Sequence, residues 1–290
     1  MIEHQTSVPM IMLITGASRG AGKGIALALA ETGATIYVTG RSAQEGDAPL
    51  PGTVFATAEE INRRGGKGIP VVVDHADDAQ VKALFSRIDR EQGRLDILVN
   101  NAACIPEGLT ASGGFWEKPL ALLDILNVGM RSHYVASYYA APIMVRQGSG
   151  LIVHTSSFGG RCYMHGPAYG AGKAAVDKMA NDMAVDLRPY GVACVSIWMG
   201  LLRTERTMQV FDAEPEKYAA LMQATESPEL TGRVIAALFQ DKALMEKSGQ
   251  ILVGAELAQA YGMTDIDGRQ PASHAPMLGS PAQANPAVVE

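Results

Sequence analysis

The feature that most constrains the fold is the glycine-rich decapeptide TGASRGAGKG at residues 15–24. An apolar run, Met10–Ile14, precedes it, and the helix-favouring run Ile25–Ala30 follows it. Glycine costs a helix interior about 1 kcal/mol relative to alanine, so glycines at the beginning of a helix need a compensating role. The segment therefore predicts a strand, a tight turn and a helix whose first turn must stay open.

Short apolar runs rich in β-branched residues alternate with longer helical patterns along the chain, and no linker divides the series. This alternation predicts βαβ units and a parallel sheet. We expect an α/β fold, a single Rossmann-type doubly wound domain with a mainly parallel seven-stranded sheet at residues 1–260, a lid at about 203–226 and a C-terminal tail at 261–290. The expected strands are 10–15, 35–39, 68–73, 95–99, 150–155, 192–198 and 250–253, and the expected helices are 22–31, 54–64, 77–92, 119–146, 168–189 and 228–239.

In this setting the glycine turn predicts a dinucleotide site. Gly16 allows the tight turn, Gly20 lets the backbone approach a pyrophosphate, and Gly22 lets the helix pack close to the sheet. The N-terminus of the helix favours the negative charge of the phosphates. The spacing TGxxxGxG differs from the commoner GxGxxG, and glycines in an ordinary surface turn are the alternative.

Composition excludes other classes of protein. The formal net charge is -6 and no Lys/Arg cluster stands out, so we expect no nucleic-acid partner. The three cysteines (Cys104, Cys162 and Cys194) show no metal spacing, and reduced thiols suit the cytoplasm, so we expect a cytoplasmic protein without a metal. The N-terminus lacks the pattern of a signal peptide, and no long apolar run predicts a membrane span.

Five further features follow the glycine turn in a fixed order. Asn100-Asn101-Ala102 comes after the predicted strand 95–99, and Asn127, Ser156, Tyr169 and Lys173 come later, with Tyr169 four residues before Lys173. From about residue 10 to 255, this set resembles the classical short-chain dehydrogenase/reductase family. The stretches at 93–102, 115–117, 127–134 and 170–175, and YGMTDIDGR at 261–269, resemble the subgroup called dehydrogenase/reductase member one. Known members of that subgroup are NADPH-dependent carbonyl reductases.

The resemblance implies a catalytic tetrad. Tyr169 and Lys173 lie at i and i+4, on one helix face. A free tyrosine, with a pKa of about 10, is a poor acid–base catalyst near neutrality, and a nearby ammonium lowers that pKa. Family membership would make Lys173 also bind the nicotinamide ribose, Ser156 orient the carbonyl, with its neighbour Ser157 as the alternative, and Asn127 hold a water in the proton relay.

Charge near the adenosine end favours NADP over NAD. Relatives that prefer NAD place an acidic residue at the end of the second strand. Here that strand ends Thr39-Gly40-Arg41, and Arg19 lies in the glycine turn, so two guanidinium groups can bind a 2′-phosphate. Glu45 and Asp47 in the following loop would repel it if they folded back. The expected cofactor-binding residues are Gly16, Ser18, Arg19, Gly20, Gly22, Arg41, Asp74, Asn101, Ala102, Lys173 and Thr204.

The resulting hypothesis is an NADP(H)-dependent oxidoreductase that interconverts a small-molecule carbonyl and a secondary alcohol. A 3-oxoacyl thioester reductase is an alternative of the same class, and a non-catalytic NADP-sensing regulator is an alternative of another class. The chain departs from the family pattern at Ala103, where glycine is usual, and at Met199, where proline is usual. The resemblance also implies a homodimer or homotetramer formed through the helices that carry Asn127 and Tyr169.

Overall fold

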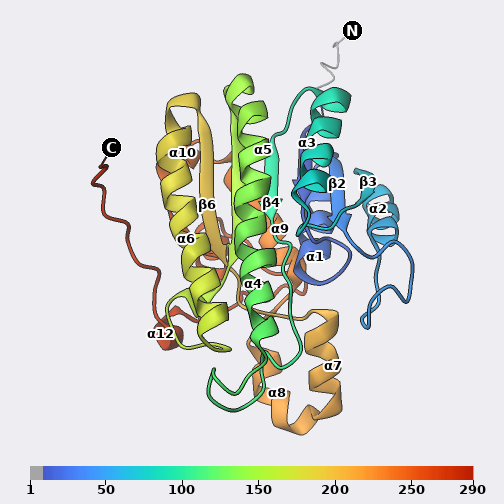
Figure 1. Ribbon diagram of the computed structural model, residues 1–290, viewed down its shortest axis with the longest axis vertical. Coiled ribbons are helices and arrows are strands. Elements are labelled where there is room, and N and C mark those ends of the chain that lie inside the picture. Colours follow the sequence, from blue (N-terminus) through green and yellow to red (C-terminus); the bar gives the residue numbers. More distant parts are fainter. Residues whose placement is uncertain (1–8, 290) are drawn as a thin grey trace.

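The central element is a seven-stranded, wholly parallel sheet with the strand order β3-β2-β1-β4-β5-β6-β9. The computed structural model describes residues 9–289, and Figure 1 shows helices on both faces of the sheet. The expected seven-stranded Rossmann-type fold is confirmed. The strands are β1 Ile11–Ile14, β2 Thr35–Gly40, β3 Lys67–Val72, β4 Ile97–Asn100, β5 Gly150–Ser156, β6 Val192–Trp198 and β9 Ile251–Val253.

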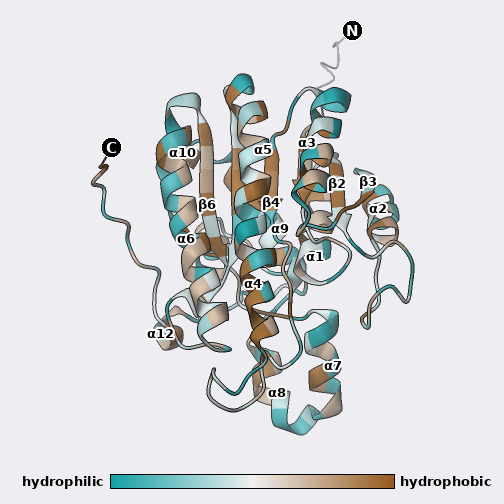
Figure 2. Cartoon of the chain, in the orientation of Figure 1, coloured by the Kyte–Doolittle hydropathy of each residue, from teal (hydrophilic) through white to brown (hydrophobic). Residues whose placement is uncertain are grey.

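Alternate strand residues supply two hydrophobic cores, one on each face of the sheet. Met12 and Ile14 of β1 face a core shared with α1, α2, α9 and α11, whereas Ile11 and Leu13 face a core shared with α3, α5 and α6. Figure 2 shows the apolar strands enclosed between the two helix layers. The helices are α1 Gly20–Ala30, α2 Val54–Arg63, α3 Asp78–Gln92, α4 Asp124–Leu126, α5 Ser132–Gln147, α6 Pro167–Leu187, α7 Glu205–Ala213, α8 Pro215–Gln223, α9 Pro228–Gln240, α10 Leu244–Lys247, α11 Gly254–Ala260 and α12 Ala275–Leu278, with 3-10 turns at 120–123, 158–160 and 188–190.

The strand order reverses at β1, which pairs with β2 on one side and with β4 on the other. In a doubly wound sheet the crevice at such a reversal, outside the carboxyl ends of the strands, is where a ligand binds. The glycine turn follows β1 and Asn100-Asn101-Ala102 follows β4, so the topology brings these two sequence motifs to the same edge.

The long helix expected over 119–146 is interrupted at Asn127. Residues 127–131 form a wide turn in which Val128 and Gly129 leave the helical conformation, Gly129 with φ +137°. Glycine tolerates that dihedral, and the Val128 carbonyl, freed from the helix, accepts a hydrogen bond from Cys104 N at 2.7 Å. The two-residue strands β7 (Leu201–Leu202) and β8 (Thr225–Glu226) were also not expected, because two residues carry no periodicity.

The segment between β7 and β8 forms α7 and α8, which lie at one end of the molecule (Figure 1). The segment after α11 packs on the domain: Asp265 is buried, and Ala275 of α12 packs with Phe158 and Trp198. Within residues 9–289, no helix is long and apolar enough to cross a membrane. The first eight residues, where the sequence shows no signal peptide, lie outside the described range.

We predict that Gly24→Ala destabilises the protein, because the added Cβ would overlap Pro228 where α1 packs against α9. Overpacking of this kind costs about 1–3 kcal/mol and outweighs the gain in helix propensity. Urea unfolding measures the change. Gly172→Ala in α6 is the control, because its Cβ would lie 3.3 Å from the flexible end of Leu126. Equal free energies of unfolding for the two variants would contradict this account of α1–α9 packing.

Candidate active site

The glycine turn is held in place by the segment that follows β4. The hydroxyl of Thr15 accepts hydrogen bonds from Asn101 N at 2.9 Å and Ala102 N at 3.0 Å, and the Asn101 side-chain amide donates to the carbonyls of Thr15 and Gly16 at 3.0 Å each. Gly16 has φ +66°, and a Cβ there would lie 2.6 Å from Ala102 Cα. Asn101 and Ala102 therefore hold the glycine turn in its conformation.

The N-terminus of α1 is the part of the turn that fits a pyrophosphate. The atoms nearest to a Cβ at Gly20 would belong to Thr204 and Glu205, at 3.7 Å or more, so this residue faces the lid without crowding. The first amides of a helix have no partner within the helix and carry partial positive charge. Gly20 N donates to a carboxylate oxygen of Glu205 at 2.8 Å, which shows that the position attracts an anionic oxygen.

Arg19 points from the glycine turn toward the end of β2. Its guanidinium donates to Ser42 Oγ at 2.9 Å and to the carbonyls of Pro51 and Gly52 at 2.9 and 2.6 Å. Arg41, which precedes Ser42 in the chain, is exposed. A Cβ on Gly40, the last residue of β2, would lie 3.5 Å from the Ser18 side chain, so Ser18 and the end of β2 face each other.

The two acids of the following loop are engaged within that loop. Asp47 accepts hydrogen bonds from the backbone amides of Ala43 and Gln44 at 2.8 and 3.0 Å, and these bonds lower its pKa. Glu45 lies 3.3 Å from Gly52 N. In this conformation, Glu45 and Asp47 are therefore bonded to their own loop and are not turned toward the place of a 2′-phosphate.

Two further predicted cofactor contacts lie at loop and helix termini. Asp74, just after β3, is half-buried and accepts a hydrogen bond from Ala76 N at 2.9 Å. Thr204 is the N-cap of α7, where its hydroxyl accepts from Thr207 N at 3.3 Å. Thr204 lies next to Gly20 at the glycine turn, whereas the contacts of Asp74 are local to its own loop.

Tyr169 and Lys173 lie on the first turns of α6, with Lys173 Nζ 5.8 Å from the centre of the Tyr169 ring. Lys173 Nζ donates to the Thr155 carbonyl at 3.1 Å. Burial lowers the pKa of Lys173 to about 8, which the nearby Asp177 opposes. Burial raises the pKa of Tyr169 and its hydrogen bond with Ser157 opposes the rise, so the expected lowering by Lys173 is not found in this form of the protein.

The two adjacent serines at the end of β5 have different surroundings. Ser157 Oγ lies 2.9 Å from the Tyr169 hydroxyl, whereas Ser156 is fully buried, with Oγ 3.5 Å from the Lys173 carbonyl. Successive residues of a strand point to opposite faces, so only one of the pair can face the Tyr169 hydroxyl. The geometry thus brings Ser157, and not the predicted Ser156, to the tyrosine. A spacing of 12 or 13 residues before Tyr169 cannot separate the two on sequence alone.

Asn127 lies at the interruption between α4 and α5 and is exposed. The wide turn that begins there turns the Val128 carbonyl toward the segment after β4. Asn127 therefore sits where the helix opens, near α6, against which α4 packs.

A buried polar cluster behind the site was not predicted as a unit. Asn100 Nδ2 donates to Ser137 Oγ at 2.9 Å and contacts His154 Nδ1 at 3.4 Å, and the rings of His154 and His133 stack with centres 5.6 Å apart. His133 Nε2 bonds to the Ala102 carbonyl at 3.2 Å. His133 Nδ1, His154 Nε2 and Asn100 Oδ1 are buried and have no hydrogen-bond partner among the described residues, although buried polar atoms are normally paired. The visible signal was a histidine inside the apolar strand LIVHTS.

Asp177 is a second buried group that the sequence analysis missed. It follows Lys173 by one helical turn and accepts hydrogen bonds from Ser196 Oγ at 2.6 Å and Trp198 Nε1 at 2.9 Å. Burial raises its pKa, and the hydrogen bonds from Ser196 and the charge of Lys173 oppose that rise. The carboxyl therefore joins β6 to the helix that carries Tyr169.

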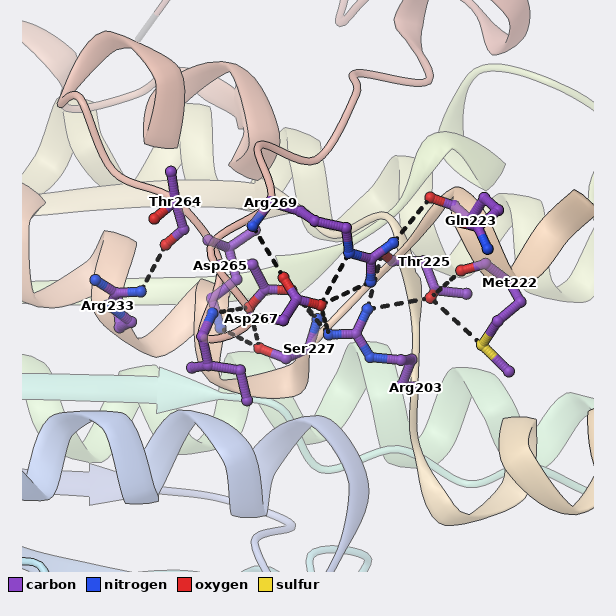
Figure 3. Close-up of polar contacts among 12 residues, drawn as sticks. Arg203, Met222, Gln223, Thr225, Ser227, Arg233, Thr264, Asp265, Asp267 and Arg269 are labelled. Carbon is purple, nitrogen blue, oxygen red and sulfur yellow. Dashed lines mark hydrogen bonds and ion pairs between the residues drawn. The ribbon is translucent and has the colours of Figure 1, made fainter.

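The base of the lid is anchored by a network around Arg203 (Figure 3). The Arg203 guanidinium donates to the Thr225 carbonyl at 3.1 Å and to the buried Asp265 carboxylate at 3.0 Å. Asp265 also accepts from Ser227 N at 2.6 Å and from the Ser227 hydroxyl. Arg269 donates to the Gln223 carbonyl at 3.1 Å. The YGMTDIDGR segment thus contacts both ends of the lid, Arg203 through Asp265 and Gln223 through Arg269.

Comparison with known proteins gives the family. The family model described as short chain dehydrogenase matches residues 10–215. The chain belongs to the short-chain dehydrogenase/reductase family. It is 44% identical over 270 residues to the mouse protein named dehydrogenase/reductase SDR family member 1, covering 89% of this chain and 84% of that one, and 42% identical to its human counterpart over the same shares.

A solved short-chain type dehydrogenase/reductase from Mycobacterium marinum superposes with a TM-score of 0.70 at 30% identity, covering 84% of this chain and 93% of that one. The family and the subgroup indicated by the sequence motifs are therefore confirmed, and the protein is an oxidoreductase of this family that uses a nicotinamide dinucleotide.

We predict that the buried histidines make the free energy of unfolding decrease as the pH is lowered. Burial lowers the pKa of His154 to about 3 and that of His75 to about 4, whereas an unfolded histidine has a pKa of about 6.5. Below pH 6.5 the unfolded chain binds protons that the folded chain does not, so the free energy of unfolding falls by about 1.4 kcal/mol per pH unit for each such histidine.

His154→Val should remove the contribution of one histidine to the pH dependence of the free energy of unfolding. Urea unfolding at pH 7.5 and at pH 5 measures the change, and the loss of unfolding free energy between the two should be about 2 kcal/mol smaller in the variant, because the full slope is reached only well below pH 6.5. An unchanged loss would show that His154 takes up a proton in the folded state.

Proposed function

We propose that this reductase interconverts a carbonyl and a secondary alcohol with NADP(H). The observation that carries the proposal is the 2.9 Å contact between Tyr169 OH and Ser157 Oγ, one helical turn from Lys173 and beside the switch-point crevice. Two hydroxyl groups that converge at this distance can both donate to one carbonyl oxygen. A bound nicotinamide would supply or accept the hydride at the carbonyl carbon.

In the reducing direction, Tyr169 donates the proton to the carbonyl oxygen and Ser157 donates a hydrogen bond that stabilises the developing negative charge. Lys173, held by the Thr155 carbonyl, keeps a positive charge near the phenolic oxygen and would hydrogen-bond the ribose. Asn127, at the opening of the helix, holds the water that returns a proton to Lys173. In this assignment Ser157 takes the role that the sequence first suggested for Ser156.

Preference for NADP is supported by charge at the end of β2. Arg19 and Arg41 lie beside Ser42, no acid ends the strand, and Glu45 and Asp47 are engaged within their own loop. A 2′-phosphate would accept charge-assisted hydrogen bonds from the guanidinium groups. Gly16, Ser18, Gly20 and Gly22 would hold the pyrophosphate, and Asp74, Asn101, Ala102 and Thr204 would line the adenine and nicotinamide ends.

The surroundings of Tyr169 suit an apolar substrate. The His165 ring meets the Tyr169 ring edge-on at 5.1 Å, and a neighbouring cavity of about 660 Å³ is lined by Phe115, Trp116 and Cys162 among others. Apolar ketones and apolar acyl thioesters both match this chemistry, so a substrate panel must contain both. The paired Tyr169 and Lys173 favour turnover over a purely sensing role.

We further propose a homodimer or homotetramer formed through α5 and α6. Tyr134 and Tyr138 on α5 and Val185 on α6 are exposed side chains that a second copy of the chain would cover. The same two helices begin next to Asn127 and Tyr169, so association would stiffen the site.

We predict that Ser157→Ala lowers kcat by about 10²–10³, the cost of one lost donor to a developing oxyanion. Ser156→Ala, the matched control, should stay within a few-fold of the unsubstituted protein. NADPH oxidation at 340 nm against ketones, diketones, steroids and acyl thioesters measures both, and Tyr169→Phe should abolish turnover. Thermal unfolding confirms that each variant is folded. A large loss confined to Ser156→Ala would return the role to that residue.

We predict that Arg19→Ala weakens NADPH binding about 10- to 100-fold, the value of one or two charge-assisted hydrogen bonds, and leaves NADH binding nearly unchanged. Fluorescence titration of each cofactor gives the two dissociation constants. Arg131→Ala, which removes an exposed partner of Asp78, is the control for loss of one positive charge. Equal weakening of both cofactors by Arg19→Ala would show that the residue acts on the glycine turn and not on the 2′-phosphate.

A further inference from the structure

The lid places a carboxylate where the phosphates of a cofactor would lie. Glu205 is the first residue of α7, and its side chain accepts the hydrogen bond from Gly20 N, the first amide of α1, at 2.8 Å. The two residues are 185 positions apart in sequence, so the contact comes from the tertiary fold. An N-terminal amide of this kind is the donor that a pyrophosphate needs.

The Gly20 amide has a single N–H group, so it cannot form a full-strength hydrogen bond to the Glu205 carboxylate and to a phosphate at the same time. A carboxylate at hydrogen-bond distance from Gly20 N would also lie next to the phosphate oxygens, where like charges repel. We propose that Glu205 is an internal competitor for the pyrophosphate subsite: it neutralises the N-terminus of α1 when no cofactor is bound and must be displaced when one binds. The inference rests on the proposed use of this turn by a dinucleotide and adds a residue that sets its affinity.

The position of Glu205 is fixed by its neighbours in sequence. Arg203, two residues earlier, is anchored to Thr225 and Asp265, and Thr204 caps the helix. Figure 3 shows the Arg203 guanidinium bonded to Asp265 and Asp267 of the C-terminal segment. Because this base is held, the first turn of α7 begins close to Gly20, and Glu205 can reach its amide.

The lid itself is lightly packed, so Glu205 can be displaced at small cost. In α7 only Phe211 is buried, and α8 has no buried residue. Phe211 and Tyr218 stack with ring centres 4.9 Å apart, which joins the two helices to each other more than to the domain. Segments with few buried apolar contacts open at low free energy. Cofactor binding therefore releases the first turn of α7 from the glycine turn.

The test compares ligands that differ in the pyrophosphate. Isothermal titration of the full chain measures the dissociation constants of ADP, which carries a pyrophosphate, and of 2′-AMP, which does not. Glu205→Gln removes the charge and Glu205→Ala removes the contact. We expect ADP to bind about 5- to 50-fold tighter to both variants, and 2′-AMP to bind within two-fold of the unsubstituted protein.

Glu216→Gln on α8 is the matched control, because it removes one exposed lid carboxylate far from any contact with Gly20. It should change neither constant. Hydrogen exchange gives an independent readout: amides at 205–211 should exchange faster when ADP is bound to the unsubstituted protein, and this change should be absent in Glu205→Ala.

The possible failures separate the two proposals. If ADP and NADPH bind but ADP binds no tighter to the Glu205 variants, or binds more weakly, Glu205 is not a competitor and the proposed function stands. If tightening is equal for ADP and 2′-AMP, the effect is a general change of charge, and the inference is overturned. If neither ADP nor NADPH binds to any form, the dinucleotide site and the inference fail together.

Discussion

The hydrogen bonds between Thr15 and the Asn101-Ala102 backbone are the constraint on which the site depends. They join the end of β1 to the end of β4 at the point where the strand order reverses. Because Gly16 has no side chain, the turn can rest directly on Ala102, and the direction of α1 follows. The first amide of α1, that of Gly20, is therefore positioned by strands that are buried in both cores.

Much of the fold could be predicted because its signals are periodic and local. Apolar β-branched runs gave the seven strands, and the glycine turn gave the switch point. The interruption at Gly129 could not be predicted in this way, since one glycine within a helical pattern is usually tolerated, and the opening depends on the segment after β4 that receives the Val128 carbonyl. Pairing of β7 with β8 likewise depends on the Arg203 network, whose members are distant in sequence.

The choice between Ser156 and Ser157 shows the same limit at the level of single side chains. Strand alternation sends adjacent residues to opposite faces, but their assignment depends on where β5 ends and how residues 158–160 turn. Ser156 is fully buried beside α6, with its hydroxyl next to the Lys173 carbonyl. Sequence spacing identifies the serine pair, and packing determines which of the two lies next to the Tyr169 hydroxyl.

The lid contains two charged contacts of different kinds, an ion pair at its base and a hydrogen bond from Gly20 to Glu205. Its base needs fixed charges, since Arg203 is held by the nearly inaccessible carboxylate of Asp265, and such a pair is costly to break. The first residue of α7 carries a charge that can be replaced, because the partner of Glu205 is the neutral backbone amide of Gly20. A lid with both features can exchange an anionic group at Gly20 without losing its anchor at Asp265. The same segment thus combines a fixed anchor at Arg203 with a first helical turn whose position depends on which anion is bonded to Gly20.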